Sequence, residues 1–233
     1  MINYQSESGG YLQANPTWHV EDSPWKTTQV LKMIERNKLQ PKTVVEVGCG
    51  AGEILNQLHQ RMADKAIEFS GYEIAPDAFK LCLERKQDRL NYFQEDLLQI
   101  DSKFDLLLMI DVFEHVDDYI GFIKKAGRKA TYKIYHIPLD MCMLNLYRNS
   151  PMSARKDAGH LHYFMKDTAL ATLTDAGQEV VDWFYTPVAS ELHYKGLTFN
   201  EKIRNLLRRF SYWINPDFTV KTFGGFALMV LTK

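Results

Sequence analysis

Residues 44–52 constrain the fold more than any other part of the chain, because an apolar run passes there into a glycine-rich turn. The run at residues 43–47 is β-branched apart from one glutamate, a composition typical of a strand buried on both faces. Apolar residues then recur at helical spacing over residues 51–63. Glycines have no Cβ, so a ligand can approach such a backbone closely. The segment predicts the first half of a βαβ unit with a ligand above its turn.

Charge and spacing within the turn narrow the choice of ligand. A dinucleotide-binding turn reads G-x-G-x-x-G, but here the third glycine comes one residue early, as Gly52, and Glu53 takes its place. Glu46 and Glu53 give the turn two negative charges and no positive one, which suits a cation better than a pyrophosphate. No G-K-S/T follows, which excludes the phosphate loop of NTPases. A sulfonium such as that of S-adenosylmethionine (SAM) fits this pattern.

A second motif lies downstream, where residues 111–116 read D-V-F-E-H-V. With E-V-G-C-G-A-G at residues 46–52, it makes the chain resemble the class I SAM-dependent methyltransferases, in the broad small-molecule branch that carries E-V-G-C-G-x-G and D-V-x-E-H-V. The resemblance covers roughly residues 44–181, with a similar ending at residues 224–232. It implies a SAM-dependent methyl transfer that releases S-adenosylhomocysteine (SAH), and it does not define the acceptor.

Strand and helix patterns alternate along the chain, which predicts a mostly parallel sheet with helices on both faces. Strands are expected at residues 43–47, 67–73, 91–94, 104–110, 131–137, 179–185 and 226–231. Helices are expected at residues 25–37, 51–63, 76–86, 119–127 and 166–176. The family resemblance implies an α/β, Rossmann-like sheet of seven strands whose last strand is antiparallel beside the fifth.

Length and composition indicate one domain. The chain has 233 residues, of which 45% are hydrophobic and 24% charged, enough for one sizeable core. We expect a single domain over residues 1–233, with an N-terminal lid and helix (1–40), a core (41–185), a helical insertion (186–221) and a final strand (222–233). The net charge of −1 gives no global attraction to nucleic acid, so a nucleic-acid partner is not expected.

The chain carries no recognisable signal peptide and no apolar run of about 18 residues, so no transmembrane segment is expected. The three cysteines, at positions 49, 82 and 142, are an odd number without metal-like spacing. A soluble protein in a reducing cytoplasm is the simplest interpretation.

Two acidic residues stand where a nucleotide would be bound. Glu73 ends the second expected strand, 25 residues after Gly48, near the place where βαβ folds bind ribose hydroxyls. The resemblance assigns Glu73 to the SAM ribose and Asp96 to the adenine amino group, with Leu97 supplying backbone. A solvated strand-end acid and a loop or N-cap acid are the alternatives for the two carboxylates. The further cofactor residues expected are Glu46, Gly48, Cys49, Gly50, Gly52, Ile74, Asp111 and Val112.

Methyl transfer asks for alignment more than for acid–base chemistry, because the sulfonium is already a strong electrophile. A base is needed only where the acceptor is a hydroxyl or a protonated amine. His115, inside the second motif, is the candidate catalytic base, since histidine is the commonest proton acceptor at neutral pH. The alternative is a structural histidine that orients its loop.

Candidate acceptor-side residues come from irregular segments. Residues 136–140 resemble the family's strand-end proline segment, 141–159 are expected to form a long loop, and 160–164 resemble its G-H-x-x-x-F segment. On extended backbone His160 and His162 share one face with ligand-like spacing, but hydrogen-bonded loop histidines explain this equally well, and no metal is expected. An aromatic lead-in at residues 11–25 either folds over the cofactor or packs on the sheet edge. The substrate-side residues expected are Trp25, His136, Arg148, His160 and His162.

Residues 199–214 are predicted to form an amphipathic helix, because seven apolar side chains recur at three- and four-residue steps. The basic residues 202, 204, 208 and 209 fall on much of the remainder. One interpretation is a helix packed on its own domain with solvated basic residues. Others are a cap over the substrate site, a peripheral contact with an anionic membrane, or a dimer interface. The sequence does not define the oligomeric state.

Three function classes follow. The first is a SAM-dependent methyltransferase that transfers a methyl group to oxygen, nitrogen or carbon of a small molecule by in-line displacement. The second is a nucleic-acid or protein methyltransferase; against base methylation, residues 111–114 read D-V-F-E rather than the D/N-P-P-Y/F element that grips a flipped base. The third is a SAM-binding module without catalysis, which the binding motifs alone do not distinguish from an enzyme.

Overall fold

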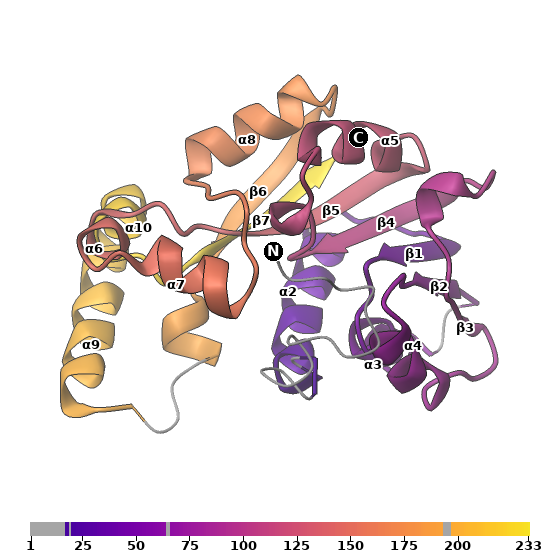
Figure 1. Ribbon diagram of the computed structural model, residues 1–233, viewed down its shortest axis with the longest axis horizontal. Helices are drawn as coiled ribbons and strands as arrows, with labels where there is room; N and C mark the ends of the chain where they lie inside the picture. The colour runs from indigo at the N-terminus through magenta and orange to yellow at the C-terminus, as the bar shows by residue number, and fades with distance from the viewer. Residues whose placement is uncertain (1–16, 19, 64–65, 193–196) are drawn as a thin grey trace.

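The structure, a computed structural model, describes residues 17–18, 20–63, 66–192 and 197–233. Its centre is a seven-stranded sheet in the order β3-β2-β1-β4-β5-β7-β6, which Figure 1 shows running through the molecule. β1 to β5 pair in parallel, whereas β7 is antiparallel to both β5 and β6. The strands are β1 Thr43–Val47, β2 Glu68–Tyr72, β3 Leu90–Phe93, β4 Phe104–Ile110, β5 Ala130–Pro138, β6 Val180–Thr186 and β7 Ala227–Thr232.

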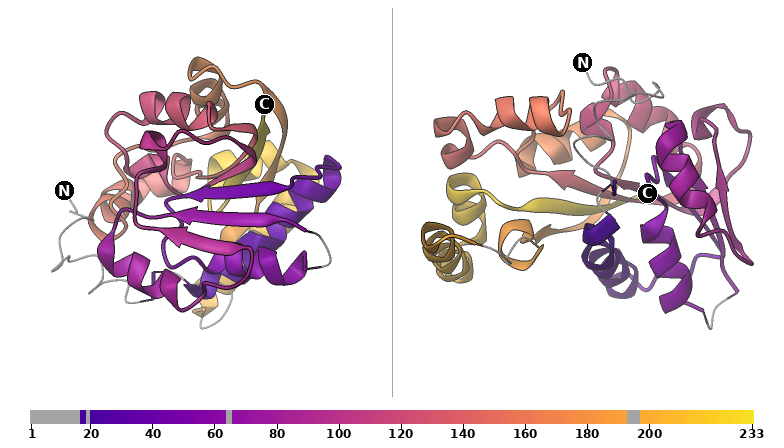
Figure 2. Two further views of the ribbon diagram at one scale, coloured as in Figure 1. Left: turned by 90° about the vertical axis from the view of Figure 1, so that its right-hand side faces the viewer. Right: turned by 60° about the horizontal axis from the view of Figure 1, so that its bottom comes forward.

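Helices cover both faces of the sheet. Figures 1 and 2 show α2 and α3 on one face and α5 and α8 on the other. The α-helices are α2 Ser23–Arg36, α3 Glu53–Arg61, α4 Pro76–Leu83, α5 Tyr119–Gly127, α6 Met143–Tyr147, α7 Ser150–Asp157, α8 Lys166–Asp175, α9 Phe199–Ile214 and α10 Pro216–Phe223. Shorter helical turns are η1 Val20–Asp22, η2 Leu97–Gln99, η3 Phe113–His115 and the π-helical η4 Val188–Leu192.

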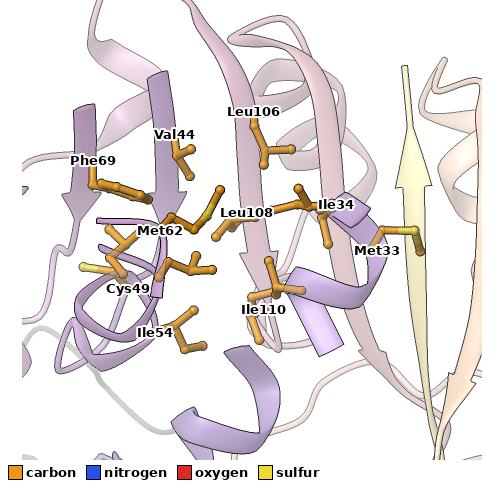
Figure 3. Packing of buried hydrophobic residues seen from close by; sticks show 14 of the residues in the cluster. Met33, Ile34, Val44, Cys49, Ile54, Met62, Phe69, Leu106, Leu108 and Ile110 are labelled. Atoms are coloured by element: carbon orange, nitrogen blue, oxygen red, sulfur yellow. The ribbon is translucent and has the colours of Figure 1, made fainter. Parts of the chain in front are cut away.

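Two hydrophobic layers sandwich the sheet, as the alternation along β4 illustrates. Leu106 and Leu108 belong to the layer beneath α2 and α3, which Figure 3 shows from close by. Leu107 and Met109 point the opposite way, into the layer beneath α5 and α8. Successive strand side chains point to opposite faces, so a strand covered on both sides must be apolar throughout. The continuous apolar runs of β1 and β4 meet this requirement.

The predicted fold class is confirmed: seven strands, mostly parallel, with the last strand antiparallel beside the fifth. The bounds of β1, β4, α5 and α9 coincide with the predicted ranges, and the remaining strands differ from them by one or two residues. The long loop predicted for residues 141–159 is wrong, because this segment contains α6 and α7. Helices of five and eight residues are too short for an apolar period to reveal them. The lead-in at residues 11–16 and position 19 lie outside the described residues.

The glycine turn between β1 and α3 is held by close packing. Gly52 has a left-handed φ of +77°, and a Cβ built on it would lie 2.5 Å from Cε1 of Tyr92. The Tyr92 hydroxyl also donates a hydrogen bond of 2.6 Å to the Gly52 carbonyl oxygen. Only glycine therefore satisfies both the backbone and the space at this position.

We expect Gly52→Ala to lower the free energy of unfolding by about 3 kcal/mol, through the left-handed backbone and the overlap with Tyr92. Gly177→Ala is the matched control, because Gly177 has a φ of +80° but no atom within 4 Å of its missing Cβ. The control should cost only about 1 kcal/mol, for the backbone alone. Chemical denaturation measures both; equal losses would show that Tyr92 moves aside freely.

Candidate functional site

A cavity of about 500 Å³ opens at the carboxyl ends of β1, β2, β3 and β4. Parallel α/β sheets bind ligands at this edge, because the loops that follow neighbouring strands converge there. Gly52 does not line the cavity. Ten of the eleven predicted cofactor residues do line it: Glu46, Gly48, Cys49, Gly50, Glu73, Ile74, Asp96, Leu97, Asp111 and Val112.

The three glycines of the turn have different surroundings. Gly48 has a φ of +64° and lies beneath Val112, whose Cγ2 would be 3.1 Å from an added Cβ. Gly50 has a φ of +56°, and a Cβ there would meet no protein atom within 4 Å. Because Gly50 also lines the cavity, its open side is a surface for a ligand. Gly52 instead forms the left-handed N-cap of α3 and so shapes the turn without lining the cavity.

Glu73 joins the end of β2 to the glycine turn. Its Oε2 accepts a hydrogen bond of 2.9 Å from the Gly50 backbone N–H, and its Oε1 accepts one of 2.8 Å from the Ala75 N–H. Burial raises the pKa of Glu73, while these backbone N–H groups oppose the rise. The carboxylate is therefore held in one position at the cavity wall, where each oxygen keeps a second lone pair for a ligand.

The cavity wall is strongly acidic. Among the described residues that line it, Lys26 is the one lysine or arginine, and Glu46 is buried with its Oε2 unpaired. Burial raises the pKa of Glu46 well above its usual range, and Glu73 adds to the rise while Lys26 opposes it. This charge imbalance favours a cationic ligand, as predicted from the turn. The acidic residues of the wall are Asp22, Glu46, Glu53, Glu73, Glu95, Asp96 and Asp111.

Asp96 is an N-cap residue, one of the two alternatives that the sequence presented, and it also lies at the cavity wall. It lines the cavity after β3, and its Oδ1 accepts a hydrogen bond of 2.9 Å from the Leu98 N–H as the N-cap of η2. Leu97 is 1% exposed, so its side chain belongs to the core beneath the cavity. The cap holds the backbone of this loop in place at the cavity wall.

A partly buried ionic network joins α2 to the sheet at the carboxyl end of β4. Asp111 contacts Lys26 Nζ through Oδ2 at 2.8 Å and His136 Nδ1 through Oδ1 at 2.6 Å. His136 Nε2 lies 3.0 Å from Thr186 Oγ1 on β6. Burial by itself would raise the pKa of Asp111. The adjacent His136 and Lys26 have the larger, opposite effect, so the pKa lies well below its usual range. Asp111 also has a left-handed φ of +54°, a strained conformation that these partners hold in place.

A second polar cluster meets the cavity through His115 and His160. His115 and His160 meet edge to face with ring centroids 5.0 Å apart, and His160 Nδ1 lies 2.7 Å from Asp140 Oδ2. Burial and His160 lower the pKa of His115 to about 4, so its imidazole is neutral at neutral pH. Neither carboxyl oxygen of the buried Glu114 has a hydrogen-bond partner among the described residues. Burial and the nearby Asp111 raise the pKa of Glu114 well above its usual range.

This cluster also has the composition of a metal-ligand set. One ligand atom from each of Glu114, His115 and His160 lies within 4.8 Å of the others. Asp140 orients His160 as an outer carboxylate often orients a metal-bound histidine. In the sequence His160 and His162 had ligand-like spacing without a metal being expected, whereas the structure brings His160 to Glu114 and His115. Both partners were visible in the D-V-F-E-H-V motif, but their meeting with His160 depends on the folded loop.

A second cavity of about 290 Å³ adjoins the first, with Lys26, Asp111 and Pro138 among the residues that line both. Trp25 and His136 line the second cavity, and His160 lines the first. Sequence reasoning missed Arg208 of α9 and Asn145 of α6, which also line the second cavity. Both belong to segments without a recognised motif.

Two predicted acceptor-side residues lie away from both cavities. His162 Nε2 donates a hydrogen bond of 2.9 Å to the Val116 carbonyl oxygen, and its ring packs on Tyr119 with centroids 4.2 Å apart. Arg148 is exposed at the end of α6 and lines neither cavity. A carbonyl can pair only with a protonated nitrogen, so His162 Nε2 is the donor.

The sheet order, the glycine turn and the acidic cavity together define a fold of the class I methyltransferase type. A protein-family model described as a methyltransferase domain matches residues 25–182. The match spans more than half of the chain, and the chain therefore belongs to this family. No curated protein matches the sequence.

Solved structures share the fold at low sequence identity. Magnesium protoporphyrin IX methyltransferase from Synechocystis PCC 6803, with bound SAH, has a TM-score of 0.58 and 13% identity over 90% of this chain and 82% of that chain. The N-methyltransferase NodS from Bradyrhizobium japonicum WM9, in complex with SAH, has a TM-score of 0.56 and 15% identity over 98% and 93%. A putative sarcosine dimethylglycine methyltransferase from Galdieria sulphuraria has a TM-score of 0.59 and 14% identity over 100% of this chain and 91% of that chain.

The ionic network predicts an acid-dependent loss of stability. The folded pKa of Asp111 lies below its unfolded value, so its contribution is complete above about pH 4 and is lost as the pH falls further. Asp111→Asn, which tolerates the left-handed backbone, should lower the free energy of unfolding by roughly 3 kcal/mol at neutral pH, because Lys26 is left buried without its counter-charge.

Denaturation curves at neutral pH and near pH 3 would measure this difference, which should shrink at the lower pH. The control is Asp117→Asn, an exposed acid in the same loop, which should change stability by less than about 0.5 kcal/mol. If the difference in free energy of unfolding between Asp111→Asn and the wild type is equal at both pH values, the assigned network is contradicted.

Proposed function

We propose that the protein is a SAM-dependent methyltransferase that acts on a small molecule at oxygen, nitrogen or carbon by in-line displacement. The observation that carries the proposal is the acidic cavity of about 500 Å³ above the glycine turn. SAM has a positively charged sulfur, which is attracted by the ionised carboxylates of a wall whose described residues include a single lysine. Family membership and the SAH bound in two structural relatives support the same cofactor.

The proposed cofactor position follows from the hydrogen-bonding groups of the wall. Glu73 offers free lone pairs beside the turn and is assigned to the ribose hydroxyls. Asp96 and the Leu97 backbone, one strand further along, are assigned to the adenine. The open side of Gly50 accommodates the methionine end, with Glu46 and Asp111 on the side of the sulfur.

The transfer step forms one bond and breaks another. A lone pair of the acceptor attacks the methyl carbon, the carbon–sulfur bond breaks, and its electrons stay on sulfur as SAH leaves. A hydroxyl or protonated amine also loses a proton, for which the His115–His160 pair is the candidate acceptor. His115 is neutral but weakly basic because its pKa is about 4, so we assign the proton to the pair rather than to His115 alone.

Charge argues against a nucleic-acid substrate. Phosphate backbones bind basic surfaces, whereas the wall of this cavity is acidic and the whole chain has a net charge of −1. Relatives with a similar fold are named for small acceptors, among them magnesium protoporphyrin IX and dimethylglycine. Both observations support a small-molecule acceptor over a polymer.

Calorimetry with SAM and SAH tests the cofactor assignment. Glu73→Gln should weaken SAH binding about 10- to 100-fold, because it loses charge-assisted hydrogen bonds worth about 1.5–3 kcal/mol. Glu68→Gln, at the exposed start of the same strand, is the control and should bind like the wild type. Binding of NAD or a nucleoside triphosphate, with no heat from SAM or SAH, would refute the proposal.

Turnover and metal use can be measured in one assay. We expect SAH to form from SAM when the small-molecule fraction of a cell extract is added, and not with its nucleic-acid fraction. EDTA should leave the rate unchanged, because a sulfonium needs no Lewis acid and an imidazole pair can take the proton. A loss restored by one divalent ion would instead identify Glu114, His115 and His160 as its ligands. SAH binding without turnover in any fraction would indicate a non-catalytic module.

A further inference from the structure

Helix α9 turns its apolar face outward. The helix begins at a capping box, in which Thr198 N–H donates to Glu201 Oε2 at 2.9 Å and Glu201 N–H donates to Thr198 Oγ1 at 3.4 Å. At about 100° per residue its apolar positions fall on a single arc of the helix. Every one of them is more than 40% exposed, and Trp213 reaches 82%. The arc consists of Phe199, Ile203, Leu206, Leu207, Phe210, Trp213 and Ile214.

The opposite, polar face fastens α9 to the domain. Arg208 is 7% exposed; its Nη1 donates to Asn205 Oδ1 at 2.7 Å and its Nη2 to the Phe223 carbonyl at 2.9 Å. Asn205 Nδ2 donates to the Ala189 carbonyl at 2.9 Å. The Tyr212 ring stacks on Phe226 with centroids 5.2 Å apart. Rotating the apolar face inward would break these bonds, so the outward orientation is built into the fold.

One sequence-based interpretation is confirmed only in part. α9 packs on its own domain and leaves Lys202 and Arg209 exposed, but it packs through Arg208 and leaves the apolar arc in solvent. Burying apolar area is favourable by roughly 25 cal/mol per Å², so a fold that leaves seven large apolar side chains in water favours a partner that covers them.

Neighbouring helices carry further exposed apolar side chains. α10 packs against both α6 and α9, and Figure 1 shows the three helices together at the end of the molecule away from β1–β3. Tyr147 on α6 is 91% exposed and Phe218 on α10 is 56% exposed. Met143 and Leu146 of α6 are exposed as well. We call α6, α7, α9 and α10 the helical end of the molecule.

The helical end is basic, unlike the rest of the chain. Residues 141–159 and 197–223 contain eight lysines and arginines and three acids, whereas the whole chain has a net charge of −1. Lys202 and Arg209 flank one side of the apolar arc and are exposed. The remaining basic residues are Arg148, Arg155, Lys156, Arg204, Arg208 and Lys221.

We propose that this end of the protein docks on an anionic lipid bilayer, with α9 lying in the plane of the interface. A strong apolar face, aromatic residues and flanking cations are the features by which helices bind there. Among the described residues, no helix is both long and apolar enough to cross a membrane. A second copy suits the surface less well, because a symmetric dimer would place two basic faces against each other.

Docking would place the second cavity behind α9, one helix diameter (~10 Å) from the lipid surface. Arg208 of α9 and Asn145 of α6 line that cavity from the helical end. An acceptor held in or on the bilayer would then enter beside α9. This last step rests on the proposed methyltransferase function, whereas docking itself does not.

Vesicle sedimentation tests the proposal with the full chain and no methyl acceptor. The wild type should bind vesicles of phosphatidylcholine with phosphatidylglycerol. Its affinity for vesicles of phosphatidylcholine alone should be at least tenfold lower. Phe210→Glu with Trp213→Glu should reduce binding at least tenfold, since both side chains are exposed and charges enter the interface poorly. Lys202→Glu should reduce it about tenfold, and added salt should weaken wild-type binding.

Controls separate docking from misfolding and from catalysis. Leu83→Glu changes an apolar residue that is 52% exposed on α4, away from the helical end, and should bind vesicles like the wild type. Glu73→Gln should also bind vesicles normally, so loss of SAH binding and loss of docking remain distinguishable. A blue shift of tryptophan fluorescence on vesicles, absent in Trp213→Phe, would place α9 at the interface.

Two results would overturn the proposal. One is equal recovery of the wild type and Phe210→Glu/Trp213→Glu with anionic vesicles at low salt. The other is a wild-type dimer that does not bind vesicles and becomes a monomer on Phe210→Glu/Trp213→Glu, which would make the arc an interface between copies. Thermal unfolding should show that Phe210→Glu/Trp213→Glu is folded, because both changed side chains are already in solvent.

Discussion

The carboxylate of Asp111 organises the edge of the sheet at which both cavities lie. It pairs with Lys26 of α2 and His136 of β5, and His136 continues the network to Thr186 of β6. Without that negative charge, a lysine that is 16% exposed would have no counter-ion in this network. A residue in a strained left-handed conformation therefore ties the first turn of α2, which lines both cavities through Lys26, to the sheet.

The acidic residues of the site differ in charge because their surroundings differ. Asp111 has two cationic or polar partners, so its pKa is lowered. Glu46 and Glu114 lie in the same region with unpaired carboxyl oxygens, so burial raises the pKa of each. Residues of one chemical type thus form an anionic anchor and two groups that favour the neutral form. Perturbed carboxyls concentrated around one cavity are typical of functional sites.

The helical end combines two surfaces in one helix. The inner face of α9 lines the second cavity through Arg208, and its outer face presents the apolar arc. On the proposed function, this one helix would join substrate access to a docking surface without a separate domain. The helices α6 and α7, which precede it, were invisible to pattern analysis because they are only five and eight residues long.

Local spacing in the sequence determined the strand and helix pattern, the glycine turn and the bounds of β1, β4 and α9. The antiparallel last strand and most of the ten predicted residues that line the first cavity were implied by the family resemblance of the motifs. Only the tertiary structure decided that His160 meets Glu114 and His115, while His162 faces a backbone carbonyl. It also decided which face of α9 points outward. The apolar period of a sequence shows that a helix has two faces. Which face is buried depends here on hydrogen bonds from Asn205 and Arg208 to the backbone of other segments.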